Sequence, residues 1–280
     1  MSVYTDIKNL KIQGASEIGK AAIIDLNSYG NHLTKVKDKN EFISEVEKHA
    51  DKLKSARPTE PLLQNCIESI MSKLRKTKSE EIIKLQKELY MHSKEEVLRL
   101  KTNMQKIIEY GVSAIPPHSI ILTHCHSHNV VNIITKADPV KVFATETRPR
   151  FQGRLTAKDI ASAGIETELI LDDEVADVID QVDMVIIGAD AITKKGVVNK
   201  IGSRMVAEIA FDHKKPVYVA ASTLKIIDKI DIEVRDPDEV WKDAPKKVKI
   251  KNYAFDTVPY KHIKKIITEK GLKDPKKIKF

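Results

Sequence analysis

The amino-acid sequence predicts an α/β protein, in which a helical N-terminal domain (residues 1–115) precedes a doubly wound, Rossmann-like parallel-sheet domain (residues 116–280). Two observations predict this class. Up to residue 115, apolar residues recur at helical spacing, whereas after Pro116-Pro117 short runs rich in valine and isoleucine alternate with stretches long enough for a helix. Continuous apolar strands that alternate with helices are typical of a parallel sheet covered on both faces.

The N-terminal domain is expected to consist of several amphipathic helices. Residues 41–56 (EFISEVEKHADKLKSA) predict one of them, and residues 79–110 carry apolar side chains on further helical stripes. Within the second stretch, Ser93 and Glu96 have the spacing of a capping box, which marks the start of a helix. We therefore predict two helices there, joined near Met91-His92.

The second domain is expected to contain five parallel strands, at residues 119–123, 141–145, 167–171, 183–189 and 216–221. In doubly wound sheets, ligands bind at the carboxyl ends of the strands. The segments that follow the predicted strands there are His124-Cys125-His126-Ser127, Glu146-Thr147-Arg148, Gly188-Ala189-Asp190 and Ser222-Thr223-Leu224-Lys225. A thiol, two carboxylates, a guanidinium and an ammonium are therefore expected to converge at one edge of the sheet.

Composition predicts a soluble cytoplasmic protein. The 280 residues include only two cysteines, Cys66 and Cys125, which fits a reducing compartment and excludes a disulfide framework. The N-terminus lacks the apolar stretch of a secretory signal, and no apolar run approaches the roughly 20 residues of a membrane span. No membrane partner is expected.

The net charge of +8 is concentrated at the C-terminal end of the chain. Residues 241–280 hold 13 lysines and four acidic residues, so this tail carries +9 and the preceding 240 residues about −1. A lysine-rich tail can bind nucleic acid or simply keep a protein in solution. Because the densest lysine run, KKVKIK at 246–251, contains no aromatic residue of the kind that stacks on bases, we favour the second role and expect no nucleic-acid partner.

The segment THCHSH (residues 123–128) allows three interpretations. His124, His126 and His128 could bind a metal, although a strand-to-helix turn would not keep their alternate spacing on one face. The segment could also be a polar turn without function. In the third interpretation, Cys125 lies where free N–H groups and the helix dipole lower the pKa of a thiol, and where a phosphate would also bind.

Three longer motifs resemble a known family. THCHSH, ETRPRFQGRLTAKDI (146–160) and IIGADAITKKGVVNKIGS (186–203) are similar to the signatures of the sugar-phosphate isomerases related to translation initiation factor 2B. The resemblance covers nearly the whole chain, from KIQGAS (11–16) to NYAFDTVP (252–259). The short THCHS form and the ETRP motif are most similar to the archaeal branch that acts on ribose 1,5-bisphosphate.

The resemblance implies an aldose–ketose isomerase in which Cys125 removes a proton from C2 of the sugar and Asp190 protonates the ring oxygen. It also implies a phosphorylated pentose as substrate, a possible nucleotide effector, a homo-oligomer (a dimer or hexamer), and neither a cofactor nor a metal. The implied substrate-binding residues are Gln13, Gly14, Ala15, Ser16, Arg57, Ser127, His128, Asn129, Asn199, Lys200 and Lys225.

One position departs from the family pattern. The N-terminal phosphate-binding segment of these isomerases usually begins RGA, whereas this chain has Gln13-Gly14-Ala15. Glutamine cannot supply the charged, bidentate fork that arginine offers to a phosphate. The alternative function is therefore a non-catalytic regulatory subunit, related to the initiation factor 2B exchange complex, that binds a nucleotide or a sugar phosphate. Cys125 together with Asp190 favours the enzyme.

Overall fold

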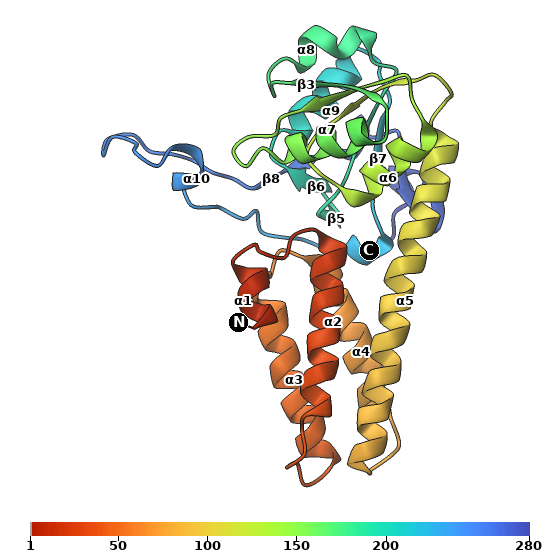
Figure 1. The fold of residues 1–280 in the computed structure, drawn as a ribbon, viewed down its shortest axis with the longest axis vertical. Helices are drawn as coiled ribbons and strands as arrows, with labels where there is room; N and C mark the ends of the chain where they lie inside the picture. The colour runs from red at the N-terminus through yellow and green to blue at the C-terminus, as the bar shows by residue number, and fades with distance from the viewer. Residues whose placement is uncertain (1) are drawn as a thin grey trace. The chain divides into compact units, whose positions relative to one another are not determined.

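The computed structural model describes residues 2–280 and divides into two compact units that meet between Asn103 and Met104 (Figure 1). The division falls inside one long helix, which contributes Ile107 and Ile108 to the core of the second unit. The expected domain boundary at 115/116 coincides with the end of that helix, and we retain it as a proposal. Within the described residues, no helix is both long and apolar enough to span a membrane.

The first unit is helical, as predicted. It contains α1 (Val3–Lys8), α2 (Ala15–Asn31), α3 (Lys39–Ser55), α4 (Pro61–Arg75) and most of α5 (Ile82–Ala114). On α3, the buried residues Phe42, Val46, Ala50 and Leu53 recur every three or four positions, which places them on one face of the helix. Gly30 lets α2 approach α5 closely, since a Cβ at this position would lie 2.2 Å from Cδ2 of Leu89.

The prediction of two helices joined near Met91-His92 is wrong, because α5 is continuous from Ile82 to Ala114. Ser93 and Glu96, which have capping-box spacing, lie in the interior of α5 and are buried. Glu96 accepts a hydrogen bond from Oγ of Ser69 (3.2 Å) and pairs with Arg99. Its carboxylate therefore contacts side chains of α4 and α5. In a capping box it would instead accept a hydrogen bond from the backbone N–H at the start of a helix.

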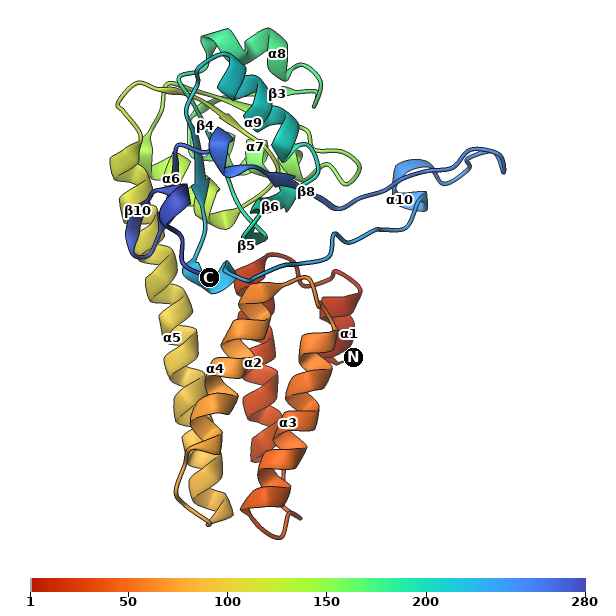
Figure 2. The same ribbon diagram turned by 180° about the vertical axis from the view of Figure 1, so that it is seen from behind.

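The second unit contains the predicted doubly wound sheet (Figures 1 and 2). Its strand order is β10-β9-β7-β4-β1-β2-β3, and every neighbouring pair is parallel except β9 and β10. The strands are β1 (Ile120–Thr123), β2 (Lys141–Thr145), β3 (Glu166–Ile170), β4 (Met184–Ile187), β7 (Val217–Ala220), β9 (Lys265–Thr268) and β10 (Gly271–Lys273). The associated helices are α6 (His128–Ala137), α7 (Gln152–Ser162), α8 (Val175–Val178) and α9 (Ser203–Asp212).

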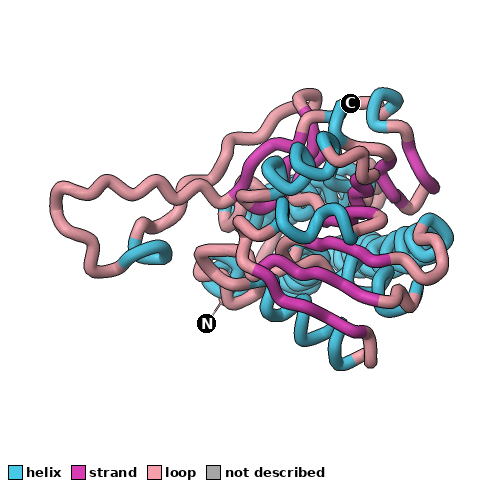
Figure 3. Tube along the Cα trace, turned by 90° about the horizontal axis from the view of Figure 1, so that it is seen from above, coloured by secondary structure: helices cyan, strands magenta, loops and turns pink. Residues whose placement is uncertain are grey.

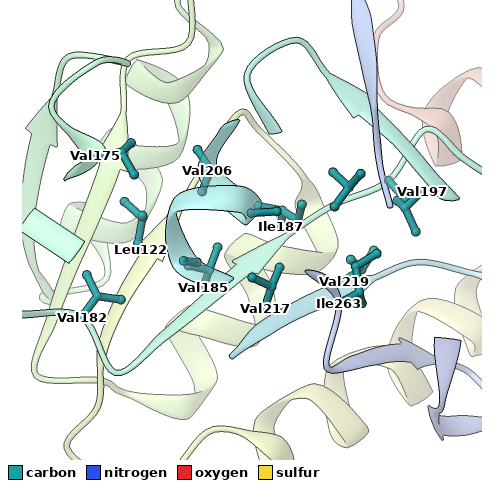
Figure 4. Packing of buried hydrophobic residues seen from close by; sticks show 14 of the residues in the cluster. Leu122, Val175, Val182, Val185, Ile187, Val197, Val206, Val217, Val219 and Ile263 are labelled. Atoms are coloured by element: carbon teal, nitrogen blue, oxygen red, sulfur yellow. The ribbon is translucent and has the colours of Figure 1, made fainter. Parts of the chain in front are cut away.

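Alternation along the strands builds a separate core on each face of the sheet. Leu122 and Val185 pack on one face with Val175 of α8 and Val206 of α9 (Figure 4). Their neighbours Ile121 and Ile186 face the other way and pack with Ile133 of α6, Ile160 of α7 and the end of α5. This two-sided burial explains why the strands read as continuous apolar runs.

A second, antiparallel sheet was not predicted. It consists of β5 (Ala191–Thr193), β6 (Gly196–Lys200) and β8 (Phe255–Val258), in the order β5-β6-β8. Residues 241–280 are therefore not a tail for most of their length, since β8, β9 and β10 belong to the two sheets, while a solubilising role of their lysines remains a prediction. Short 3-10 helices complete the unit, at Ile179–Gln181 (η1), Thr223–Lys225 (η2), Tyr260–His262 (η3) and Pro275–Lys277 (η4).

Between β7 and β8 the chain leaves the globular part of the second unit. Residues 234–253, which we call the arm, project from it and carry the short helix α10 (Asp238–Trp241) (Figure 3). The two sides of the arm are joined at its base, where the N–H of Arg235 donates to the carbonyl oxygen of Asn252 (2.8 Å) and Val234 bridges to Tyr253.

Candidate active site

The sheet topology places Cys125 and Asp190 at a topological switch point. Strands β1 and β4 are neighbours, and the chain proceeds from β1 toward β2 and β3 but from β4 toward β7 and β9. Cys125 follows the carboxyl end of β1, and Asp190 follows that of β4. Open α/β sheets bind their ligands in the crevice that this divergence creates.

The backbone of Cys125 is fixed from two sides. Its φ of +68° lies in the left-handed region, which is uncommon for a residue other than glycine. Its N–H donates to Oγ1 of Thr147 (3.0 Å), after β2, and its carbonyl oxygen accepts from Oγ1 of Thr156 (2.8 Å), on α7. The turn that carries the thiol is thus held by two hydroxyl groups from neighbouring elements.

The pKa of the Cys125 thiol is shifted in the direction opposite to the expectation. Burial raises the pKa of Cys125 to about 11, and the negative charge of Asp190 adds to this effect. The positive charge of Lys200 and a hydrogen bond from the backbone N–H of His126 act in the opposite direction. Removal of the thiol from water outweighs these stabilising contacts, so the resting side chain is a neutral thiol.

Lys200 is the charged group most deeply enclosed at this site. It is the last residue of β6 and only 5% exposed, with its Nζ 5.4 Å from the ring centroid of Phe255. Burial lowers its pKa, while the negative charges of Cys125 as thiolate and of Asp190 raise it. The ammonium group is therefore placed to stabilise an anion at the thiol or at the carboxylate.

His124 joins three elements from a buried position. Its Nε2 lies 2.8 Å from the carbonyl oxygen of Ile201, and its Nδ1 lies 2.6 Å from Oγ1 of Thr145. A carbonyl oxygen only accepts, so Nε2 carries the proton and Nδ1 accepts from the threonine hydroxyl. Burial lowers the pKa of His124, which favours this neutral form. Both ring nitrogens are thus engaged with the protein.

Gly202 accommodates this histidine. Its φ is +99°, and a Cβ at this position would lie 2.9 Å from Cε1 of His124. Gly202 is also the N-cap of α9, and its N–H donates to Oδ2 of Asp256 (2.8 Å). The turn between β6 and α9 therefore needs a glycine for both its backbone conformation and the close approach of the imidazole.

His126 has a structural hydrogen bond as well. Its Nδ1 lies 3.0 Å from Oγ1 of Thr156, whose own proton is donated to the carbonyl oxygen of Cys125. Nδ1 of His126 is consequently the donor to Thr156. The rings of His126 and His128 meet edge to face at 5.0 Å. Within residues 2–280, no group of three His, Cys, Asp or Glu side chains is arranged to hold a metal ion.

Most of the predicted binding residues of the second unit gather at the switch point. Ser127 is the N-cap of α6, with His128 and Asn129 in its first turn, but its hydroxyl makes no capping hydrogen bond. A Cβ on Gly188, after β4, would lie 3.0 Å from Oγ of Ser127 and 3.8 Å from Oδ1 of Asn199. The ends of β1, β4 and β6 therefore lie close together.

Asn199 and Lys225 each have a partner within the protein. Nδ2 of Asn199 donates to Oγ of Ser203 (2.8 Å), and Nζ of Lys225 donates to the carbonyl oxygen of Ala189. The second bond brings the lysine of η2 next to Asp190. The fold thus holds the ammonium group of Lys225 at the carboxyl end of β4.

The remaining predicted residues belong to the first unit. Gly14 has a φ of +83° and is the N-cap of α2, whose first turn contains Ala15 and Ser16. The side chain of Gln13 is exposed and donates through Nε2 to the carbonyl oxygen of Leu10 (2.9 Å). Arg57 lies between α3 and α4, where its carbonyl oxygen accepts from the N–H of Glu60 (3.1 Å). Their role in substrate binding remains a proposal.

Several residues that support the site were missed in the sequence. Thr145, Thr147 and Thr156 contribute the hydroxyl groups described above, and Asp172 accepts from the N–H of Thr147 (2.8 Å) and of Arg148 (2.7 Å). Only their position in the sequence indicated a role for two of these threonines. Thr145 is the last residue of a predicted strand and Thr147 follows it, at the edge of the sheet where ligands bind.

Comparison with known proteins places the chain in a family. Residues 11–275 match the Initiation factor 2 subunit family. The chain is 38% identical to the ribose 1,5-bisphosphate isomerase of Methanocaldococcus jannaschii, over 97% of this chain and 90% of that protein.

Two solved structures from Pyrococcus horikoshii OT3 have the same fold. The 5-methylthioribose 1-phosphate isomerase has a TM-score of 0.82 at 30% identity, covering 98% of this chain and 83% of its own. The translation initiation factor eIF-2B also has a TM-score of 0.82, at 26% identity, covering 98% and 96%. The chain belongs to the Initiation factor 2 subunit family.

Proposed function

We propose that the protein converts ribose 1,5-bisphosphate to ribulose 1,5-bisphosphate, with Cys125 and Asp190 as the proton-transfer pair. The broader class rests on the comparisons: two relatives that are 38% and 30% identical over nearly the whole chain are isomerases of sugar phosphates, and this chain is an aldose–ketose isomerase of that kind. The observation that carries the finer proposal is the position of Cys125 and Asp190 after the neighbouring strands β1 and β4, where the carboxylate charge raises the pKa of the thiol.

The chemistry requires one acid and one base. A phosphate on C1 prevents the sugar ring from opening to a free aldehyde, so the bond from C1 to the ring oxygen must break as C2 loses its proton. An acid protonates the ring oxygen while a base takes the C2 proton, and a C1–C2 double bond forms. The base then returns a proton to C1, and the C2 hydroxyl gives its proton to the conjugate base of the acid, which yields the ketose.

The protonation state of the Cys125 thiol determines the first step of the reaction. Because the pKa of Cys125 is about 11, its thiol must first lose its proton. Transfer of that proton to the Asp190 carboxylate creates both the thiolate base for C2 and the carboxylic acid for the ring oxygen. Lys200 stabilises the thiolate through its positive charge. One proton shared by the two groups thus supplies both functions, and the pair is restored at the end of the cycle.

The substrate phosphates require positive charge and N–H donors. In the second unit, Lys200, Lys225 and the first turn of α6 at Ser127, His128 and Asn129 are the proposed ligands. In the first unit we assign the same role to Arg57 and to the start of α2, where Gly14 exposes backbone N–H groups.

The deciding experiment is to incubate the purified protein with ribose 1,5-bisphosphate and follow the 2-ketose by NMR. Parallel samples should contain 5-methylthioribose 1-phosphate and ribose 5-phosphate. We expect turnover of the bisphosphate. Turnover of the methylthio sugar alone would keep the enzyme class and replace the substrate. Absence of turnover with every aldose 1-phosphate would contradict the catalytic proposal.

The second candidate function is a regulatory subunit without turnover. It is favoured by the 26% identity to a structure named as translation initiation factor eIF-2B and by Gln13 at the position of the family arginine. In that case a sugar phosphate or nucleotide should bind without reaction. Isothermal titration with adenosine monophosphate and ribose 1,5-bisphosphate, beside the NMR assay, separates the two functions. A nucleotide effector, assembly as a dimer or hexamer and a cytoplasmic location remain predictions.

A further inference from the structure

The parallel sheet ends in an exposed edge. β3 is the last strand on its side of the sheet, with β2 as its neighbour, so its outer backbone N–H and C=O groups face outward. Glu166 and Glu168 project on one face, with side chains 68% and 52% exposed. Leu169 projects on the other face and is 44% exposed, and Leu171, which follows the end of the strand, is 50% exposed. An edge with exposed leucines is a template for another strand.

The segment that contains this edge is strongly acidic. Between residues 166 and 183 there are eight carboxylates and no lysine or arginine. Lys141 of β2 pairs with both Glu166 (3.5 Å) and Glu168 (2.6 Å), and one ammonium against two carboxylates leaves a negative charge. A strand added here would be favoured by positive side chains on its matching face.

The outer part of the arm has the sequence pattern of such a strand. Residues 246–251 read KKVKIK, so Lys247, Lys249 and Lys251 alternate with Val248 and Ile250. In an extended backbone this alternation places the lysines on one face and the apolar side chains on the other. Among the described strands none includes this segment, and Val248 is 45% exposed. The pattern is that of a half-buried strand, but among the described residues this segment does not pair with a strand of either sheet.

The arm is held firmly where it leaves the globular part. Nη2 of Arg148 donates to the carbonyl oxygen of Val240 (3.2 Å), and Arg150 pairs with Glu239 (3.2 Å). Nδ2 of Asn252 donates to the carbonyl oxygen of Asp236 (2.7 Å). These bonds direct the outer part away from the sheets (Figure 3), where it is available to another molecule.

We propose that residues 246–251 of one copy of the chain add as an extra strand to the β3 edge of a second copy. The lysine face of the arm would meet Glu166 and Glu168, and Val248 with Ile250 would cover Leu169 and Leu171. Main-chain hydrogen bonds supply affinity in this mode of binding, and the alternating side chains set the register. Because each copy carries both an arm and an edge, two copies exchange arms about a two-fold axis.

Charge reversal on each side tests the pairing. The arm variant is Lys247→Glu with Lys249→Glu, and the edge variant is Glu166→Lys with Glu168→Lys. In analytical ultracentrifugation each variant alone should dissociate with a constant at least tenfold above that of the wild type. An equimolar mixture of the two should associate again, because both exchanged contacts then join opposite charges. Wild-type association should also weaken with rising salt.

A matched control is Lys76→Glu with Lys78→Glu, which makes the same charge change on exposed lysines between α4 and α5. This control should leave the dissociation constant of the assembly unchanged. Hydrogen exchange of the β3 amides gives a direct readout, with protection in the wild type that is lost in the arm variant. A wild type that is monomeric at micromolar concentrations overturns the proposal, as does unchanged association of both variants. Protected β3 amides in a monomer would place the arm on the edge of its own chain and overturn it too.

Discussion

The backbone N–H of Cys125 donates a hydrogen bond to Oγ1 of Thr147 across 3.0 Å, and this bond joins the turn after β1 to the turn after β2. Both residues have left-handed backbones, with φ of +68° at Cys125 and +64° at Thr147. Such conformations cost about 1–3 kcal/mol each outside glycine and persist where surrounding contacts enforce them. Here the carboxylate of Asp172 and the hydroxyl of Thr156 supply those contacts.

Thr147→Val should lower kcat by about ten- to a hundredfold with little change in KM. Valine has nearly the same shape but no oxygen, so the N–H of Cys125 loses its partner, at a cost of about 1–3 kcal/mol. The thiol would then occupy its reactive position for a smaller fraction of the time. Steady-state kinetics by NMR measures the change, and Thr135→Val on α6 is the control. Equal kcat in the two variants would show that the bond does not position Cys125.

Removal of either proposed catalytic group should abolish useful turnover. Cys125→Ser and Asp190→Asn should each lower kcat at least a hundredfold, since a positioned acid or base contributes roughly 10²–10⁴ to the rate. Substrate binding, followed by isothermal titration, should persist in both. Cys66→Ala is the control for loss of a thiol, because Cys66 is buried in α4 of the first unit. Normal turnover in Cys125→Ser or Asp190→Asn would reject the assigned roles.

The pKa of the thiol can be measured by alkylation. In a Cys66→Ala background, the rate of reaction with iodoacetamide should still be rising at pH 10, because burial raises the pKa of Cys125 to about 11. The charge of Lys200 lowers this pKa and that of Asp190 raises it. Lys200→Gln should therefore shift the rate profile to higher pH, and Asp190→Asn to lower pH. A plateau below pH 8 in the wild type, or shifts of one sign in both variants, would contradict this electrostatic description.

Sequence patterns predicted the parallel sheet because strands buried on both faces leave a strong signal, as in the run from Met184 to Ile187. The same topology brought Cys125 and Asp190 to one edge. The antiparallel sheet escaped prediction because β5 and β6 are short, and β6 ends in the polar pair Asn199-Lys200, which is buried through tertiary contacts.

Local sequence patterns gave wrong predictions at two places where contacts between distant parts of the chain determine the outcome. Ser93 and Glu96 resemble a helix start, yet Glu96 is buried inside α5 and bonded to Ser69 of α4. The helix dipole suggested an acidic thiol at Cys125, but the depth of burial, which the sequence does not reveal, reverses the direction of its pKa shift.

Asp256 predicts a pH dependence of stability. Burial raises its pKa to about 6, although its carboxylate accepts hydrogen bonds from the N–H groups of Gly202 and Arg204 at the start of α9. In an unfolded chain the pKa of an aspartate is about 3.9. Between about pH 4 and 6 the folded protein thus binds more protons here than the unfolded one, and this contribution to the free energy of unfolding falls as pH rises.

Urea unfolding of the wild type and of Asp256→Asn at pH 4 and pH 7 isolates this contribution. The asparagine does not titrate, so the stability of the wild type relative to the variant should be greater at pH 4 than at pH 7. The change is at most about 3 kcal/mol, from a shift of roughly two pKa units. A difference between the two proteins that stays constant, or that grows with pH, would show that the carboxylate is not desolvated in the folded state.

Gln13 tests whether the start of α2 binds a substrate phosphate. Its Nε2 donates to the carbonyl oxygen of Leu10, so the side chain is held at the entrance of the helix next to Gly14. Gln13→Arg should lower the KM for ribose 1,5-bisphosphate with kcat unchanged. A hydrogen bond to a charged group contributes roughly 1.5–3 kcal/mol, or on the order of ten- to a hundredfold in affinity. Gln13→Ala is the matched control, since it removes the amide without adding charge.

Loss of turnover in Gln13→Arg would mean that the pocket has adapted to glutamine and to a substrate with one phosphate fewer. Assays with ribose 1-phosphate would then show turnover. If neither variant changes KM for any sugar phosphate, residues 13–16 lie outside the binding site, and the regulatory function becomes the better explanation of this segment.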